Sequence, residues 1–551
     1  MVAELFASPF LAPLLSGKSS ADRIDAVEAA LRTGGQTARS ELGKWINRLV
    51  PVETLVPEAH QAYRPLVRDA FAFVFSRLSD RRLATKLVEQ IELPADTSPE
   101  QRLIRLISKM PGLQKLGQVL ARNRRLAPAL QKALCELENG MSDVTADEIR
   151  GIIVEQLGSR LDIYGVEMDP SIFKEGSASA ILQFTWQRPD RERGAFKVLK
   201  PYVPQCFAED MTLLTQLGEY LADKNRAYGF AVRDLKEMVA EVRLLLEHEL
   251  DFPREQATLR EAHRMYRGTF GIRVPRLIQP LCTARITAMT AENGVKVTDA
   301  FRKSEVRRER IAAQIIEGLI AVPLFSRGDM AVFHADPHAG NLLYDEPNRE
   351  LVILDWALAD RLSLTARRHV VLLAVMTILR NPAGVSEAIC ALSRRDRRGR
   401  HAPKRWIDSR VKRFFAQFPE GRSPGVLDAM VLLDEIALEG VRFPAALFMF
   451  RKILFTLDGV LHDVAGPGVR IDHLMAQEFL TRWVASFGVF HAPLALKDCG
   501  AVAWNALRFA GQSVPWPSLT GLAGVFRGLT PVRTSTSSRP KKALRPALRR
   551  P

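Results

Sequence analysis

Residues 333–360 read FHADPHAGNLLYDEPNRELVILDWALAD and place two histidines, an asparagine and several aspartates between short hydrophobic runs. Asp336 and Asn341 are five residues apart, and Asp355 ends the apolar run LVILD. The turn formers EPNRE separate two apolar stretches, which predicts that these stretches pair as a β-hairpin. Such a hairpin would bring Asp355 back beside the loop of Asp336 and Asn341.

The predicted hairpin, which pairs 342–345 with 351–354, points to a metal and phosphate site. Mg²⁺ prefers oxygen ligands, commonly one or two carboxylates together with phosphate oxygens. Phosphoryl transfer needs such a cation, a positioned nucleophile and a cationic side chain on the phosphates. Protein kinases use an Asp, an Asn five residues later and a further Asp for this purpose. The alternative interpretation is an ordinary loop rich in turn-forming residues.

The two histidines of this stretch are not expected to bind a metal as a pair. His334 and His338 are four residues apart, but a metal pair at this spacing needs a helix. Pro337 lies between them and disfavours a helix. We therefore expect His334 to shape the loop through a hydrogen bond.

Two upstream residues complete the pattern of a kinase-like site. Lys197 lies among apolar residues in GAFKVLKP, a predicted strand, where an ammonium is costly to bury unless it is paired. Glu255 follows in ELDFPREQA, on helical sequence that Pro253 should break or offset. The alternative is that each of these two side chains is an exposed charge, as is common for both residue types.

The composition is typical of a soluble globular protein with several domains. The chain has 551 residues, of which 47% are hydrophobic and 25% charged, and its formal net charge is +16. Its five cysteines are scattered, which argues against a disulfide framework or a zinc site and indicates a reducing compartment. The start lacks a basic n-region, so no signal peptide is expected, and no apolar run is long enough to predict a transmembrane helix.

The last 19 residues, RTSTSSRPKKALRPALRRP, have seven basic and no acidic side chains. Such a tail cannot bury enough apolar area to fold alone. It could bind an anionic lipid surface, or it could be a solvated tail without a partner. No base-reading motif accompanies it, so specific nucleic-acid binding is not expected.

The hydrophobic periodicity predicts helices over residues 20–160, with helix starts near Ser98 and in SDVTADEIRGIIVEQLG. SASAILQFTWQRPDRERGAFKVLKPYV predicts two strands joined by a charged turn. RRERIAAQIIEGLIAVPLF places Ile311, Ile315, Leu319 and Val322 on one helical face. Helices follow again from about 364 to 510.

Six motifs in this order resemble the UbiB/AarF (ADCK-like) family of atypical protein-kinase-like proteins. QKLGQVLARNRRLAP is similar to the K-x-G-Q signature, SASAILQF to the alanine-rich loop and AFKVLKP to the strand of the nucleotide lysine. ELDFPRE is similar to the E-x-D segment with the helix glutamate, HADPHAGN to the catalytic loop and LDWALAD to the metal-binding segment. Together the motifs cover roughly residues 105 to 375 and are far more specific than one pattern.

The resemblance implies binding of ATP and Mg²⁺ and a role for each motif. Lys197 would hold the α- and β-phosphates, Glu255 would orient it, and Asp336 would occupy the base position. The metal ligands would be Asn341 and Asp355. The remaining residues of the site would come from the alanine-rich loop (Ala178, Ser179, Ala180) and from a lid over the cleft, in which Lys115 and Gln118 reach toward Glu249 and Asp251.

The resemblance also implies an α+β, bilobal protein-kinase-like fold, with a small β-rich N-lobe and a helical C-lobe. Helical N-terminal and C-terminal regions would be added to it. The expected divisions are a helical region (1–100), a K-x-G-Q-type extension (101–165), a kinase-like domain (166–400), a helical C-terminal region (401–525) and a basic tail (526–551).

Three departures from the family pattern affect the predicted loops. Ala339 replaces a proline, which should only loosen the catalytic loop. Trp356 and Ala357 replace Phe-Gly, which should restrict movement of the metal-binding segment because Ala resists conformations open to Gly. Leu182 replaces a glycine and is expected to hinder close approach of the backbone to a phosphate.

We therefore predict an ATP- and Mg²⁺-dependent atypical kinase or ATPase. The resemblance implies support of isoprenoid quinone or other lipid metabolism, with a lipid or quinone precursor as partner, and a cytoplasmic location with peripheral attachment to the inner membrane. Two alternatives stay open. One is a pseudokinase scaffold that binds nucleotide without turnover, and the other is a small-molecule phosphotransferase, which would lack the K-x-G-Q segment.

Overall fold

A computed structural model describes most of the chain and divides it into two compact units. The first consists of Met1–Arg264, Val274–Asn293 and Leu354–Leu358, and the second of Met265–Arg273, Gly294–Ile353 and Ala359–Pro551. The described residues are 19–50, 58, 61, 64–94, 96–115, 143–176, 178–187, 191–228, 243–300, 305–394, 402–419, 424–466, 469–472, 474–475, 478–479 and 493–513. Helices and small sheets together confirm the α+β class, while the predicted domain boundaries stay predictions.

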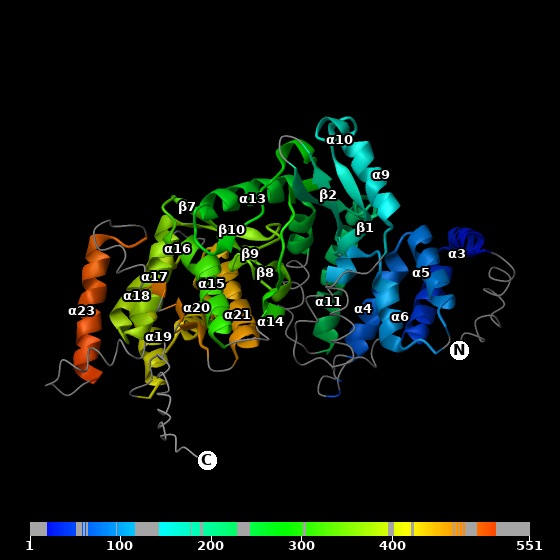
Figure 1. Ribbon diagram of the computed structural model, residues 1–551. Helices are drawn as coiled ribbons and strands as arrows, with labels where there is room; N and C mark the ends of the chain where they lie inside the picture. Colours follow the sequence, from blue (N-terminus) through cyan, green and yellow to red (C-terminus); the bar gives the residue numbers. More distant parts are fainter. Residues whose placement is uncertain are drawn as a thin grey trace, which may run out of the picture. The chain divides into compact units, whose positions relative to one another are not determined.

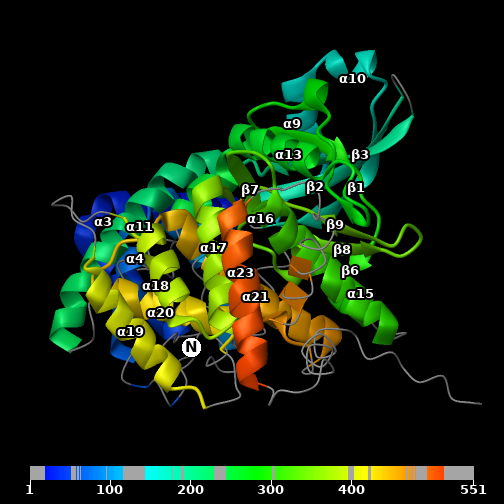
Figure 2. The same ribbon diagram turned by 90° about the vertical axis from the view of Figure 1, so that its left-hand side faces the viewer.

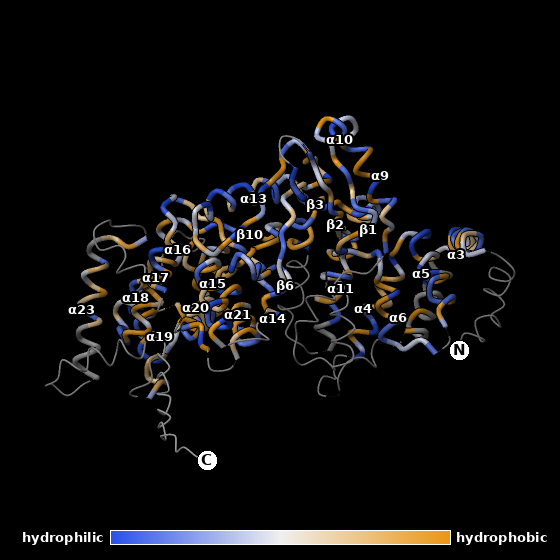
Figure 3. Tube along the Cα trace, in the orientation of Figure 1, coloured by the Kyte–Doolittle hydropathy of each residue, from blue (hydrophilic) through white to orange (hydrophobic). Residues whose placement is uncertain are grey.

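The first unit begins with helices that pack around one hydrophobic core (Figure 1). These are α3 (Ser20–Leu49), α4 (Arg64–Arg77), α5 (Asp80–Ile91) and α6 (Pro99–Ile107), joined by the later α11 (Val203–Tyr228). Leu213, Leu217 and Leu221 lie four residues apart along α11, on the face that contacts this core. Hydrophobic and hydrophilic residues alternate along these helices, as amphipathic packing requires (Figure 3).

The first unit then forms a four-stranded antiparallel sheet in the order β1-β2-β3-β5. Its strands are β1 (Glu167–Glu175), β2 (Ser179–Trp186), β3 (Glu192–Leu199) and β5 (Ile286–Thr290), preceded by α9 (Ala146–Leu157) and α10 (Arg160–Ile163). The helix α13 (Phe252–Tyr266) and the 3₁₀ turn η3 (Gln279–Leu281) lie between β3 and β5 in the sequence. The predicted strand pair around Lys197 is thus confirmed as β2 and β3.

Successive residues of β2 and β3 point to opposite faces of the sheet. Leu182 lies opposite Phe196, and both belong to a buried cluster with Ile149 and Ile153 of α9. Thr145 and Glu148 form a capping box at the start of α9, which confirms the helix start predicted there. The sheet face that packs on α9 is therefore a closed hydrophobic core. Polar side chains of the sheet that could bind a ligand must lie on the opposite face.

The second unit contains two small sheets and a group of helices. Its strands are β4 (Ile272–Arg273), β6 (Val295–Lys296), β7 (Met330–His334), β8 (Leu342–Asp345), β9 (Glu350–Ile353) and β10 (Ala359–Ser363). Its helices are α14 (Val297–Ala300), α15 (Glu305–Ile316), α16 (Val322–Phe325), α17 (Leu364–Ile378), α18 (Pro382–Leu392), α19 (Lys404–Ala416), α20 (Val426–Leu438), α21 (Ala445–Ala465) and α23 (Leu496–Ser513). Figure 2 shows α17, α18, α20 and α21 packed together.

The hairpin predicted from the opening stretch is present in the second unit. β8 pairs antiparallel with β9 from Leu342 opposite Ile353 to Asp345 opposite Glu350, and β9 also pairs with the parallel strand β4. The helical face predicted over 311–322 is buried as expected, but a π-helical turn, η4 (Glu317–Ala321), joins α15 to α16. The spacing of apolar residues did not reveal this turn, because residues 318–321 are all buried and show no one-sided pattern.

The helices that the structure describes include none with the length and hydrophobicity needed to cross a membrane. The four cysteines within the described ranges are free thiols, as their scattered positions predicted.

Replacing Gly194 by Ala should destabilise the first unit. A Cβ at Gly194 would overlap the buried ring of Phe184, which stacks on Phe196 with 3.9 Å between ring centroids. Overpacking of this kind costs about 1–3 kcal/mol of unfolding free energy. Thermal unfolding midpoints of the purified variants would show the loss.

The matched control is Gly151→Ala in α9, where no atom lies within 4 Å of the new Cβ. That change should stabilise the protein by about 0.5–1 kcal/mol, because Ala favours a helix interior over Gly. An unfolding midpoint of Gly194→Ala equal to that of the unmodified protein would contradict the packing described for this sheet.

Candidate functional site

Lys197 lies on the face of the sheet opposite the α9 core. On β3 it is flanked by Ile181 of β2 and Thr287 of β5, whereas its neighbour Phe196 points into the core. Lys197 is only 7% exposed, so its ammonium needs a partner. The sequence prediction of a lysine inside a strand is correct.

Glu255 lies in the first turn of α13, the helix that packs on the Lys197 face. Residues 243–250 are helical, the helix is interrupted at Asp251, and α13 starts at Phe252. Pro253 therefore stands where its missing N–H costs nothing, as the sequence predicted. Asp251 accepts a hydrogen bond from the Arg254 N–H at 3.0 Å and so caps α13.

Lys197 and Glu255 form a buried ion pair. Lys197 Nζ lies 2.7 Å from Glu255 Oε1, and Glu255 is 2% exposed. The Phe252 ring, with its centroid 5.8 Å from Nζ, also contacts the ammonium. Within the described part of the chain, Glu255 Oε2 is buried without a hydrogen-bond partner. The pair is thus desolvated and has one polar atom left over.

The charges of this pair are strongly coupled to their surroundings. Burial raises the pKa of Glu255 to about 7, while the Lys197 charge acts in the opposite direction. For Lys197, burial acts to lower the pKa, but Asp355 and Glu255 together outweigh it and raise the pKa above its ordinary value. The ammonium therefore remains charged at neutral pH.

Asp355 reaches the same ammonium from the metal-binding segment. Its Oδ1 lies 3.1 Å from Lys197 Nζ and also accepts a hydrogen bond from the Ala357 N–H. Asp355 has a φ of +54°, a left-handed conformation that Asp adopts more readily than most residues. Trp356 is 1% exposed and fixes the segment in the interior.

The predicted catalytic loop follows β7 and is held by its own hydrogen bonds. His334 is fully buried, and its Nδ1 accepts the Asp336 N–H at 3.2 Å, which confirms that it shapes the loop. The Asp336 carbonyl accepts the His338 N–H at 2.9 Å and the Asn341 Nδ2 at 3.2 Å. This leaves the Asn341 Oδ1 as the atom that could ligate a cation.

The structure therefore brings the predicted site residues together in two groups. Lys197, Glu255 and Asp355 meet in the first unit, and Asp336 and Asn341 meet in the second. The roles assigned to these residues stay predictions.

The alanine-rich turn lies between β1 and β2, but two of its alanine side chains face the interior. Ala178 is 5% exposed and Ala180 is fully buried, whereas Ser179 is half-buried on the same face as Lys197. Only backbone groups of Ala178 and Ala180 thus remain for a ligand. The expectation for Leu182 was wrong, because its side chain points into the α9 core and away from the Lys197 face.

Part of the predicted lid is also visible. Lys115 is 5% exposed and forms an ion pair with Glu249, as predicted. Gln118 lies outside the described residues. Asp251 is exposed and caps α13, so its observed role is structural.

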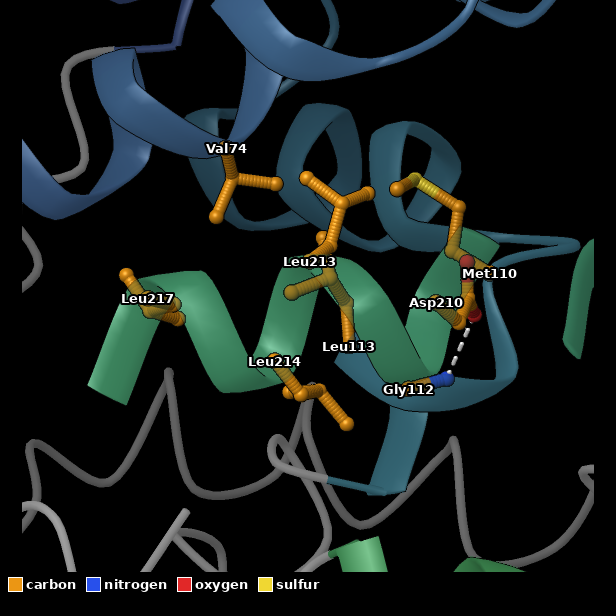
Figure 4. Close-up of a pocket in the computed structure, with 8 residues that line it drawn as sticks. All are labelled: Val74, Met110, Gly112, Leu113, Asp210, Leu213, Leu214 and Leu217. Atoms are coloured by element: carbon orange, nitrogen blue, oxygen red, sulfur yellow. Dashed lines mark hydrogen bonds between the residues drawn. The ribbon is translucent and has the colours of Figure 1, made fainter. Parts of the chain in front are cut away.

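A small apolar pocket lies beside the segment that leads to Lys115 (Figure 4). It is lined by Val74, Met110, Gly112, Leu113, Asp210, Leu213, Leu214 and Leu217. The Gly112 N–H donates to the Asp210 carboxylate at 2.8 Å, and Arg82 pairs with the other oxygen of this carboxylate. This bond attaches the start of the extension to α11.

The donor set fits a cation that is bound mainly by phosphate. The described residues contain no cluster of three or more His, Cys, Asp or Glu side chains that could hold a metal. Asp355 of the first unit is 43% exposed and offers a carboxylate, and Asn341 of the second unit offers an amide oxygen. Each is an oxygen ligand of the kind that Mg²⁺ takes together with nucleotide phosphates.

Sequence reasoning missed Gln256, which fixes the orientation of α13. Gln256 is 8% exposed, and its Nε2 lies 2.8 Å from the Thr283 carbonyl, 3.1 Å from the Ile286 carbonyl and 3.2 Å from Thr287 Oγ1. The residue before it, Glu255, is thereby held over the sheet. An uncharged side chain directly after the glutamate at a helix start was the available signal, and it is a weak one.

Residues 136–389 match the profile of the ABC1 atypical kinase-like domain. The chain is 26% identical over 292 residues to the "Probable protein kinase UbiB" of Xylella fastidiosa, covering 51% of each protein. It is 22% identical over 380 residues to "Protein ACTIVITY OF BC1 COMPLEX KINASE 7, chloroplastic" of Arabidopsis thaliana, covering 67% of this chain and 53% of that protein. The chain thus spans about half the length of these curated relatives.

Among solved structures, the complex of Rv3197 with erythromycin from Mycobacterium tuberculosis is similar at 16% identity. The match covers 64% of this chain and 87% of that chain, and its TM-score of 0.43 is too low to establish a shared fold.

Replacing Lys197 by Met should destabilise the protein more at pH 8 than at pH 5. Glu255 would then lie buried without its cation, so its folded-state pKa would rise further above the 4.5 of an unperturbed glutamate. A folded state that binds a proton more tightly than the unfolded state loses stability as the pH rises. We expect a loss of about 3–5 kcal/mol at pH 8 and a smaller loss at pH 5.

Thermal unfolding midpoints at both pH values, each compared with the unmodified protein, measure this difference. The double variant Lys197→Met/Glu255→Gln is the control and should show no additional loss at pH 8. Equal losses for Lys197→Met at the two pH values would mean that Glu255 does not depend on Lys197.

Proposed function

Because the chain belongs to the UbiB/ABC1 family of atypical kinase-like proteins, we propose that it binds ATP with Mg²⁺ and transfers or hydrolyses the terminal phosphate. The buried pair of Lys197 and Glu255, with Asp355 on the same ammonium, is the observation that carries this proposal. A lysine ammonium has three donors, so Lys197 can keep Glu255 and still contact a phosphate oxygen.

Each residue of the proposed site has a chemical task. Lys197 binds and orients the α- and β-phosphates, and Glu255 holds the ammonium in place. Asp336, whose backbone is held by the side chains of His334 and Asn341, accepts the proton of the attacking hydroxyl or water. Asn341 and Asp355 would hold Mg²⁺, which when bound neutralises charge on the phosphates.

The kinase-like architecture is also part of the proposal. The β1-β2-β3-β5 sheet with α13 would act as the small lobe, and the helices from α15 to α21 would act as the helical lobe. The alternation of these elements along the chain supports this division, because the lysine strand, glutamate helix, catalytic loop and metal segment follow one another in the expected order.

The ion pair of Lys115 and Glu249 supports a lid that limits access of protein substrates. It joins the K-x-G-Q segment to the helical residues that lead into α13. Turnover of ATP with water or a small lipid acceptor is therefore favoured over phosphorylation of other proteins.

The proposed cellular role follows from the family and from the charge of the chain. We propose a cytoplasmic protein that attaches peripherally to the inner membrane and supports isoprenoid quinone or other lipid metabolism. Its basic residues 533–551, which lie outside the described residues, would contact anionic lipid.

A pseudokinase scaffold is the second candidate, and the metal-binding segment favours it. Trp356 is almost fully buried, and Ala357 stands where a glycine would allow wider movement. Bound nucleotide would then set a conformation without being turned over. The small-molecule phosphotransferase is less favoured, because it does not account for the segment around Lys115.

Purified protein should hydrolyse ATP in the presence of Mg²⁺, and Asp355→Asn should lower the rate at least about 100-fold. Loss of a transition-state charge interaction of about 2.7 kcal/mol corresponds to this factor. A phosphate-release assay with and without membrane lipid measures the rate, with Asp360→Asn as the control aspartate.

Binding of Mg²⁺–ATP without turnover under either condition would replace the enzyme proposal with the scaffold. Turnover that Asp355→Asn leaves unchanged would remove Asp355 from the site.

The protein should bind vesicles of anionic phospholipid more tightly at low salt than at high salt. Attraction between exposed charges is screened over about 10 Å at 0.1 M ionic strength. Deletion of residues 533–551 should weaken binding to these vesicles in a co-sedimentation assay. Vesicles of neutral phospholipid serve as the control. A truncated protein that binds as well as the full chain would exclude the tail from this role.

A further inference from the structure

A second buried lysine lies three residues after Lys197. Lys200 follows the end of β3 and is 1% exposed. Its Nζ lies 2.6 Å from Asp143 Oδ1 and 3.0 Å from Glu175 Oε2. The Tyr202 hydroxyl donates to Asp143 Oδ2 at 2.9 Å, and the Asp143 N–H donates to Glu175 Oε2 at 3.2 Å. We name these four residues the Lys200 cluster.

The charged side chains of the Lys200 cluster are buried and paired, while Tyr202 is half-buried. The side chains of Asp143 and Glu175 are 2% and 9% exposed, so the ammonium is paired with two carboxylates in the interior. Burial, together with the nearby Asp143, raises the pKa of Tyr202, which therefore stays a neutral hydrogen-bond donor. Because the ammonium and both of its carboxylate partners are buried, Lys200 is not a second phosphate-binding lysine.

Lys200 holds both ends of the alanine-rich turn. Its side chain binds Glu175, the last residue of β1, and its backbone N–H donates to the Ala178 carbonyl at 3.0 Å, just before β2. Within the turn, the Gly176 N–H donates to the Ser179 carbonyl at 2.7 Å. One residue of the lysine strand thus fixes where the turn leaves one strand and enters the next.

The cluster also reaches the K-x-G-Q extension through Asp143. In sequence, Asp143 directly follows residues 116–142, which include Gln118, and it precedes α9. Both of its carboxylate oxygens and its backbone N–H are bonded within the cluster. The extension is therefore joined at Asp143 to the turn and to the end of β3.

Buried ionic clusters are an expensive way to hold a fold. Removing one partner leaves an uncompensated charge, whereas apolar residues of similar volume often stabilise a protein equally well or better. What a charged cluster adds is a defined direction for each bond. Here the bonds define the position of a turn whose end, Ser179, pairs with Leu199, two residues along β3 from the proposed phosphate lysine.

We propose that the Lys200 cluster positions the turn between β1 and β2 for the phosphates of a nucleotide, with Lys200 as the positioning residue. This inference rests on the proposed function, because it requires ATP to bind at Lys197. Loss of the cluster would let the turn move away from the phosphates, while contacts to the adenosine part of the ligand would persist.

Calorimetric binding of Mg²⁺–ATP and of adenosine to the full chain tests this role. Lys200→Met should weaken Mg²⁺–ATP binding about tenfold, equivalent to ~1.4 kcal/mol, and should change adenosine binding less than about twofold. Lys200→Arg, which keeps the charge, should recover most of the ATP affinity. If Lys200→Met does not fold, Tyr202→Phe removes one bond and should weaken ATP binding alone by about threefold.

Lys86→Met is the matched control. Lys86 is a buried lysine of α5, 4% exposed, that pairs with Glu89 and Ser108, and its loss should leave the ratio of ATP to adenosine affinity unchanged. Equal weakening of ATP and adenosine by Lys200→Met, or no weakening in a folded variant, would overturn the positioning role. Absence of ATP binding by the unmodified protein would instead overturn the proposed function and, with it, this role.

Discussion

A charged ammonium inside a β-sheet is the constraint on which the site depends. Lys197 is almost fully buried and stays protonated, so the fold must place carboxylates against it. Glu255 does so from α13 and Asp355 from the metal-binding segment. Both elements are held independently, α13 by Gln256 and the segment by Trp356. Within the first unit, the ammonium thus binds the carboxylates of Glu255 and Asp355, which are 58 and 158 positions away in sequence.

Lys200, directly after β3, also positions the turn between β1 and β2. Lys197 and Lys200 are three residues apart, and each is neutralised by two carboxylates. Lys197 keeps an opening toward solvent at Asp355, which is 43% exposed, whereas the charged side chains of the Lys200 cluster are buried. This difference separates a lysine suited to bind a ligand from a lysine suited to hold a backbone segment.

The sequence was informative wherever periodicity and charge agreed. The strand of Lys197, the interruption of the helix before α13 and the β8–β9 hairpin follow from local patterns. The pair of Lys115 with Glu249 was implied by the family resemblance. Leu182 was misjudged because a difference in residue type from the family pattern does not show which face of the strand the side chain occupies. The π-turn at 317–321 and the Lys200 cluster were not predicted, since each depends on tertiary contacts that leave no periodic signal. Asp143 and Glu175 are 32 residues apart and look like ordinary charges in the sequence.

We propose that Lys197 and the metal ligands Asn341 and Asp355 contact one bound nucleotide. An experimental structure with Mg²⁺ and a non-hydrolysable ATP analogue measures this most directly. We expect phosphate oxygens within about 3 Å of Lys197 Nζ, with Glu255 still paired, and one cation shared by Asn341 and Asp355. A nucleotide bound away from Lys197, or a cation that contacts neither Asn341 nor Asp355, would contradict it.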